Sequence, residues 1–94
     1  MEGLARLKVP GGKLIIVKLK YEKKIELLQI LGDFFLYPEA SLKKIEDSIV
    51  GMSIDATEAE ISRRISEVSK SEGVEMIGIT PESIAQTVVM AVKK

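Results

Sequence analysis

The sequence predicts an α+β fold of two layers, in which a three-stranded antiparallel meander sheet is covered by about three helices. Two observations support this prediction. Apolar and charged residues alternate through the first third of the chain, whereas apolar residues recur at helical spacing through the rest. A chain of 94 residues can bury only a modest core, so we expect one domain over residues 1–94.

The first strand is expected over residues 4–9. Ala5, Leu7 and Val9 are apolar and the residues between them are charged, which is typical of a half-buried strand. Pro10-Gly11-Gly12 then predicts a turn, because proline presets one turn dihedral and glycine tolerates positive φ.

Two further strands are expected over residues 13–20 and 25–31, with the meander ending at Gly32. Both segments are rich in branched apolar residues. Residues 21–24 should form the loop between them. Such short connections favour antiparallel neighbours.

The first helix is expected to begin at Pro38-Glu39 and to end at Gly51, a residue suited to helix termination. Its apolar stripe should bury one face against the sheet. The members of the stripe are Leu42, Ile45, Ile49 and Val50.

The second helix should begin at a capping box, since Thr57 precedes Glu60 by three residues, and should end at Gly73. A short extended segment is expected over residues 74–79. Thr80-Pro81-Glu82 then predicts the start of a third helix, with a capping threonine and a proline at its first position.

The composition argues against stand-alone catalysis. The chain has no cysteine and no histidine, which removes thiolate nucleophiles, disulfides and the commonest general base and metal ligand. We therefore predict no catalytic and no metal-binding residues. No segment has the length of a membrane span or the pattern of a leader peptide, so a cytoplasmic protein without membrane contact is expected.

Charge is unevenly distributed although the net charge is zero. Residues 1–24 hold seven Lys or Arg against two Glu, and residues 25–94 hold seven against twelve acidic residues. The folded surface could mix these charges, or the amino-terminal hairpin could offer a basic face to an acidic partner or to phosphate. Nucleic acid is a poor candidate, because the whole domain is not basic and its aromatic residues are not interleaved with lysines.

Two motifs have weak chemical meaning. Pro10-Gly11-Gly12-Lys13 resembles a phosphate-binding loop, but it leads into a strand rather than a helix and lacks the full spacing, so an ordinary hairpin turn explains it better. The carboxylate pairs Glu46-Asp47 and Glu58/Glu60 are expected to be solvated surface or capping residues, because neighbours on a helix do not share a face.

The aromatic residues are concentrated at one junction. Three of the four lie within residues 34–37, where a strand should end and a helix should begin. Aromatic side chains bury large areas in cores and in interfaces. This junction is therefore either the centre of the core or a surface on which another protein docks.

Several segments, spread over nearly the whole chain, resemble the accessory domain of lipoate-protein ligases, and the block Gly32-Asp33-Phe34-Phe35 with Pro38-Glu39 is the most specific of them. The others are Lys8 to Leu14, the branched strand Ile25 to Leu31, the helix end Ile45-Glu46 to Gly51, and Gly78-Ile79-Thr80-Pro81-Glu82. One departure is visible. Many relatives have a glycine in the turn before the third strand, whereas residues 21–24 contain none, which leaves the turn type open.

The resemblance implies a free-standing accessory subunit of the archaeal two-component type, which would form a heterodimer with a large catalytic subunit. Lipoate and ATP with magnesium would then bind to that partner, and no cofactor to this chain alone. The accessory domain is needed for activation of lipoate to lipoyl-AMP, and much less for transfer to a lysine of lipoyl-acceptor domains, which this chain would serve indirectly. Such a chain has no catalytic residues of its own but is part of an ATP-dependent ligase complex, so the resemblance leaves open whether it counts as an enzyme.

The residues expected near the partner or the nucleotide are Gly11, Gly12, Lys13, Asp33, Phe34 and Phe35. One phenylalanine should face the core and the other the partner, and the sequence does not say which. The alternative function is an independent adaptor that binds another protein through its sheet edge or its aromatic junction, with no link to lipoylation.

Overall fold

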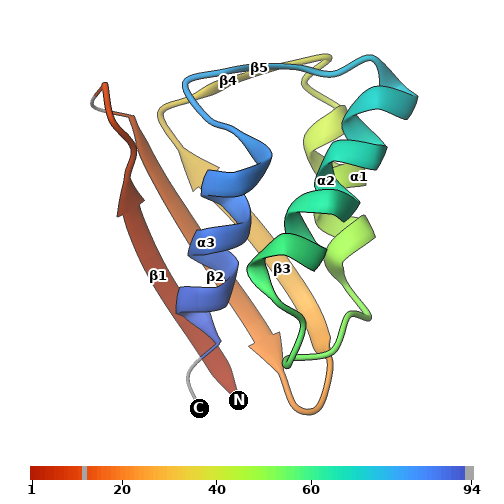
Figure 1. Cartoon of the computed structure of the whole chain (residues 1–94). Coiled ribbons are helices and arrows are strands. Elements are labelled where there is room, and N and C mark those ends of the chain that lie inside the picture. Colours follow the sequence, from red (N-terminus) through yellow and green to blue (C-terminus); the bar gives the residue numbers. More distant parts are fainter. Residues whose placement is uncertain (12, 93–94) are drawn as a thin grey trace.

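A computed structural model describes residues 1–11 and 13–92. Three strands form an antiparallel sheet in the order β1-β2-β3, and three helices follow (Figure 1). The elements of this main fold are β1 (Glu2–Lys8), β2 (Leu14–Tyr21), β3 (Ile25–Gly32), α1 (Ser41–Ile49), α2 (Glu58–Glu72) and α3 (Pro81–Ala91). This arrangement confirms the predicted fold class.

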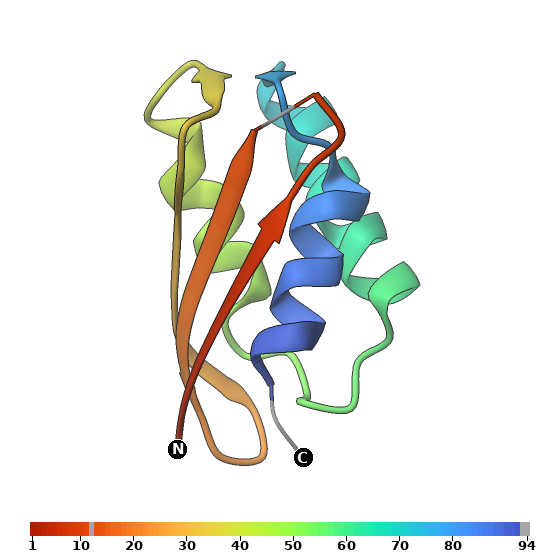
Figure 2. The same cartoon turned by 90° about the vertical axis from the view of Figure 1, so that its left-hand side faces the viewer.

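The helices leave one face of the sheet open. Helix α3 packs over β1 and β2, α1 packs beside β3, and α2 contacts both other helices (Figures 1 and 2). Alternate strand residues point toward the helices, and Val17 and Ile30 at the centre of the sheet are almost fully buried. Because side chains alternate along a strand, the residues between them form the other face, here called the open face.

The core is built mainly from isoleucine. Each helix contributes fully buried branched side chains, for example Ile45 from α1, Ile65 from α2 and Ile84 from α3. The predicted stripe of α1 therefore packs beside β3, whereas the apolar side of α2 packs on α1 and α3. Val50 is the exception, since 37% of its surface is exposed and it lies beyond the end of α1.

The predicted capping box of α2 is present. The Thr57 hydroxyl accepts a hydrogen bond from the Glu60 amide at 3.1 Å, and the Thr57 amide donates to Glu60 Oε1 at 2.8 Å. The Thr57 amide, and after it the hydroxyl, hold the pKa of Glu60 below its ordinary value. Thr80 and Ser83 cap α3 in the same way, and Gly73 ends α2 in the left-handed conformation.

Two expectations, the loop position of Tyr21 and the solvation of Glu46, are wrong. Tyr21 is not in the loop but ends β2, where a register shift beside Lys20 turns it into the core with 2% of its surface exposed. The turn that follows needs no glycine, since no described residue other than glycine has a positive φ. Glu46 is also not simply solvated, because its Oε2 accepts a hydrogen bond from the Ile30 amide of β3 at 2.8 Å.

Helix α1 begins at Ser41, later than the predicted Pro38-Glu39. The preceding residues are committed to a second, two-stranded sheet made of β4 (Phe35–Tyr37) and β5 (Glu75–Ile77). The chain turns toward the helix only after β4, where the Ser41 amide donates to the Pro38 carbonyl. Among the described residues, no helix combines the length and apolar character needed to cross a membrane.

Candidate docking site

One end of the molecule brings together the turn between β1 and β2, the junction between β3 and β4, and the strand β5 (Figure 1). Strands β4 and β5 form a small antiparallel ribbon, here called the aromatic ribbon. Its pairs are Phe35 with Ile77, Leu36 with Met76, and Tyr37 with Glu75. Residues 38 to 42 positions apart in sequence thus share one surface.

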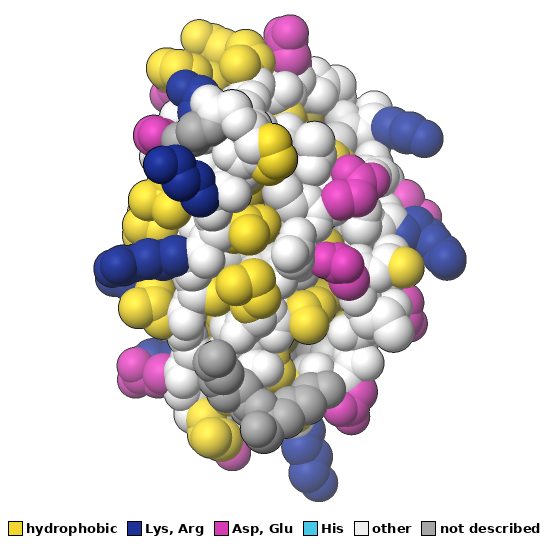
Figure 3. All heavy atoms as spheres, turned by 60° about the vertical axis from the view of Figure 1, so that its left-hand side comes forward, with side chains coloured by type: hydrophobic (Ala, Val, Ile, Leu, Met, Phe, Trp, Pro, Cys, Tyr) yellow, Lys and Arg dark blue, Asp and Glu magenta, His cyan; other side chains and the backbone are white. Residues whose placement is uncertain are grey.

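The aromatic ribbon has a buried side and an exposed side. Leu36 is 6% exposed and packs into the core. On the other side, Phe35, Tyr37 and Ile77 expose 58%, 51% and 44% of their surfaces. Hydrophobic side chains gather at this end of the molecule in the space-filling view (Figure 3). Exposed aromatic side chains on a rigid strand pair are the residue types that dominate protein interfaces.

Phe34 and Phe35 have different environments, as the sequence analysis expects. Phe34 is half-buried and packs against the core, whereas Phe35 points away from it on the exposed side of the aromatic ribbon. The alternation of side chains along an extended backbone produces this division. Phe35 is therefore the phenylalanine available to a partner.

Asp33 fastens the junction between β3 and β4 to the start of β2. Its Oδ1 accepts a hydrogen bond from the Leu14 amide at 2.6 Å, and its own amide donates to the Leu14 carbonyl at 3.3 Å. A carboxylate that accepts from a backbone amide makes a comparatively strong hydrogen bond. Asp33 thus holds the base of the aromatic ribbon in place.

Lys13 lies across the chain that leaves β5. A Cβ atom built on Gly78 would lie 2.7 Å from Lys13 Cγ and 3.3 Å from its Cε, so the lysine stem occupies the space that only a glycine leaves open. Gly78 has a φ of 90°. Gly11 also has a positive φ, with open space around it, and Gly12 lies outside the described residues.

The structure thus brings Lys13, Asp33, Phe34 and Phe35 to one end of the fold. Sequence reasoning missed Tyr37 and Ile77. Tyr37 carried a usable signal, because it lies two residues after Phe35 and so faces the same side of a strand. No pattern linked Ile77 to them. The described residues contain no group of three or more acidic side chains that could hold a metal ion.

No family model matches the chain. A curated protein, "Lipoate-protein ligase A subunit 2" of Thermoplasma acidophilum, is 32% identical over 66 residues, which cover 67% of this chain and 62% of that protein. The chain thus spans less than two thirds of that relative's length.

The comparison with solved structures covers more of the chain. The matched chain comes from a structural analysis of an archaeal lipoylation system, a bipartite lipoate-protein ligase and its E2 lipoyl domain from Thermoplasma acidophilum. The TM-score is 0.76, and the sequences are 31% identical, with 94% of each chain covered. The fold defines a small α+β subunit, and its exposed ribbon is a candidate docking surface. The chain belongs to the family of the second subunit of bipartite lipoate-protein ligases.

Proposed function

We propose that this chain is the non-catalytic accessory subunit of a two-component lipoate-protein ligase. It binds the large catalytic subunit as a heterodimer and enables ATP-dependent activation of lipoate to lipoyl-AMP, before transfer to a lysine of a lipoyl domain. The match to a bipartite ligase over 94% of both chains carries this proposal. The lipoate, ATP and magnesium sites belong to the catalytic subunit.

The aromatic ribbon is the surface on which the catalytic subunit docks. Phe35, Tyr37 and Ile77 together form an exposed apolar patch on a backbone that Asp33 fixes. A preformed patch loses little conformational entropy on binding. Docking would favour the arrangement of the catalytic subunit that is competent for activation, which requires that the accessory subunit bind this arrangement more tightly than the others.

Reconstitution tests the proposed function. The pure chain is expected to form no lipoyl-AMP, and its addition to the catalytic subunit should restore lipoyl-AMP formation from lipoate and ATP. Transfer from preformed lipoyl-AMP to saturating lipoyl domain should change only slightly. Equal stimulation of both steps would contradict a role confined to activation, and absence of any stimulation would refute the proposed function.

Lys13 provides a second prediction about activation. Its stem packs on Gly78, so replacement by alanine would remove both packing and charge. Lys13→Met keeps an aliphatic stem and removes only the ammonium group. If that group contacts the nucleotide or a partner carboxylate, the rate of lipoyl-AMP formation at saturating subunit should fall about tenfold. An unchanged rate for Lys13→Met would make Lys13 a packing residue of an ordinary hairpin.

The alternative is an adaptor unrelated to lipoylation, which would use the same exposed ribbon. The two functions differ in what the chain co-purifies with. A catalytic ligase subunit that lacks a small carboxyl-terminal domain of its own would favour the accessory role, and such a subunit should co-purify with this chain.

A further inference from the structure

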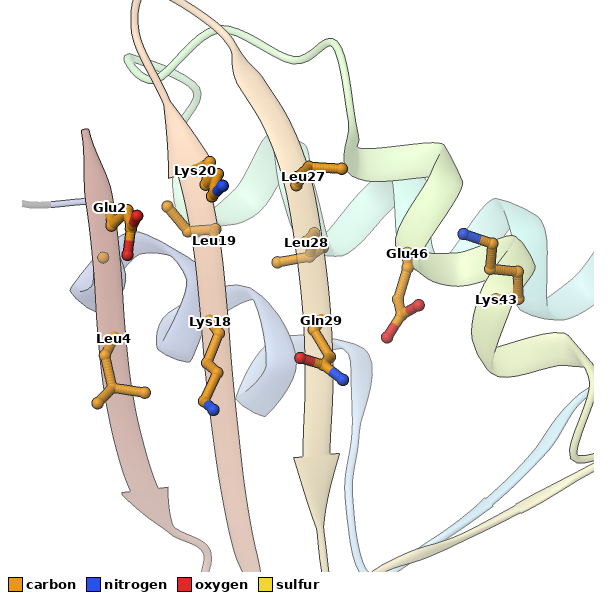
Figure 4. A pocket seen from close by; sticks show the side chains of 11 residues that line it. Glu2, Leu4, Lys18, Leu19, Lys20, Leu27, Leu28, Gln29, Lys43 and Glu46 are labelled. Carbon is orange, nitrogen blue, oxygen red and sulfur yellow. The ribbon is translucent and has the colours of Figure 1, made fainter.

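The open face of the sheet is basic and partly apolar, and the aromatic ribbon does not use it. Two neighbouring rows of cross-strand partners show its character. Leu4, Lys18 and Gln29 form one row, and Arg6, Ile16 and Leu31 form the next. Figure 4 shows the first row side by side on β1, β2 and β3. Each row therefore places a cation beside an apolar side chain rather than beside a carboxylate.

The cations of this face have no ion-pair partner among residues 1–11 and 13–92. Arg6, Lys8, Lys18 and Lys20 are all exposed, and no ion pair or hydrogen bond of their side chains occurs within the described residues. Glu2, which lies opposite Lys20, is the single carboxylate in the same rows. Four of the seven cations in residues 1–24 thus share one face. The excess positive charge of this segment is therefore concentrated on the open face of the sheet.

The open face also contains a shallow groove of about 670 Å³. Its apolar part includes Leu4 and Leu27, which expose 50% and 58% of their surfaces, and Lys18 and Lys20 lie between them (Figure 4). At the edge toward α1, Glu46 is engaged with the backbone of β3. Two leucines with lysines between them are complementary to a partner surface that has an apolar centre surrounded by carboxylates.

The groove and the aromatic ribbon lie at different ends of the sheet. The groove is lined by the start of β1, the end of β2, the start of β3, and Lys43 and Glu46 of α1. The ribbon instead follows the end of β3 (Figure 1). A partner confined to the ribbon therefore leaves the groove accessible. Two separate surfaces of different chemistry fit two different partners.

We infer that the open face binds an acidic surface of the lipoyl-acceptor domain. This inference rests on the proposed function, under which the acceptor domain is the other macromolecule that the heterodimer must meet. Charge complementarity argues for the acidic character of that surface, because four cations without partners face one carboxylate. Docking would raise the local concentration of the acceptor domain and leave the chemical step unchanged. It would therefore raise the transfer rate only at concentrations of lipoyl domain that do not saturate the ligase.

A binding titration tests the inference without any need for lipoyl-AMP formation. Purified, unmodified lipoyl domain is titrated into the full-length chain and into the heterodimer, at low and at high salt. The wild-type chain should bind it, and affinity should fall as salt is raised. Lys18→Glu should weaken binding about tenfold or more, because it places a carboxylate at the centre of the basic rows.

Lys23→Glu is the matched control. It makes the same charge change in the same hairpin, but Lys23 lies in the turn between β2 and β3, outside the rows. In the heterodimer, Lys18→Glu should raise the KM for lipoyl domain about tenfold and leave kcat and lipoyl-AMP formation unchanged.

Equal affinity of wild type and Lys18→Glu for the lipoyl domain would overturn the inference, as would equal weakening by Lys23→Glu. Loss of binding to the catalytic subunit in Lys18→Glu would assign the open face to that subunit and overturn it as well. Failure of the wild-type chain to stimulate lipoyl-AMP formation would instead refute the proposed function, and the titration would still decide on the docking face.

Discussion

Replacement of Phe35 by alanine is expected to leave the fold nearly intact and to weaken binding of the catalytic subunit by about 2 kcal/mol, or about 30-fold. Phe35 is 58% exposed and lies with Tyr37 and Ile77 on the exposed side of the aromatic ribbon, so its removal leaves no cavity in the core. The measurements are thermal unfolding of the isolated chain and titration with the catalytic subunit.

Phe34→Ala is the matched control for this prediction. Phe34 packs against the core, and its truncation should therefore cost stability, about 2 kcal/mol for a side chain that is only partly buried. The two neighbouring substitutions should thus separate stability from binding. Unchanged affinity of the Phe35→Ala chain for the catalytic subunit would show that the aromatic ribbon is not the docking site.

Local sequence signals were sufficient for most of the fold. Period-two alternation predicted the main strands, and threonine and glycine signals placed both ends of α2, because these features depend on residues close in sequence. The Thr57 and Glu60 capping box is formed as predicted, with its two hydrogen bonds. The stripe of α1 also buries Ile45 and Ile49, as expected.

The aromatic ribbon could not be predicted in the same way. Each of its strands has only three residues, too few to show a period, and the pairing of Phe35 with Ile77 joins segments separated by α1 and α2. Formation of the ribbon also explains why α1 begins later than predicted. The residues just before Pro38 form β4, so the chain can enter the helix only after this strand has ended. Tertiary pairing here overrides a local helix-start signal at Pro38-Glu39.

The candidate site could be assembled from the sequence only in part. The Gly32-Asp33-Phe34-Phe35 block was recognised as one unit because its residues are adjacent in sequence. The contact of Lys13 with Gly78 and the exposure of Ile77 both depend on where the chain returns after α2. Likewise, the composition of the open face depends on strand pairing, which places Lys18 beside Leu4.

Replacement of Gly32 by alanine is expected to disrupt both the fold and the docking site. A Cβ atom at this position would lie 2.0 Å from the Leu14 carbonyl oxygen and 2.9 Å from two ring carbons of Phe34. The first of these atoms is backbone, so the strands β2 and β3 must separate locally. That separation would also break the link between Asp33 and Leu14 that holds the aromatic ribbon.

Strain and overpacking together should reduce the free energy of unfolding of Gly32→Ala by about 3 kcal/mol or more. Gly11→Ala is the matched control, because Gly11 also has a positive φ but no atom lies within 4 Å of its added Cβ. It should lose only the backbone cost of about 1 to 2 kcal/mol. Urea unfolding measures both variants. An equal decrease in the free energy of unfolding for both variants would mean that the junction relaxes around the new methyl group. Gly32 would then be required only for its backbone conformation.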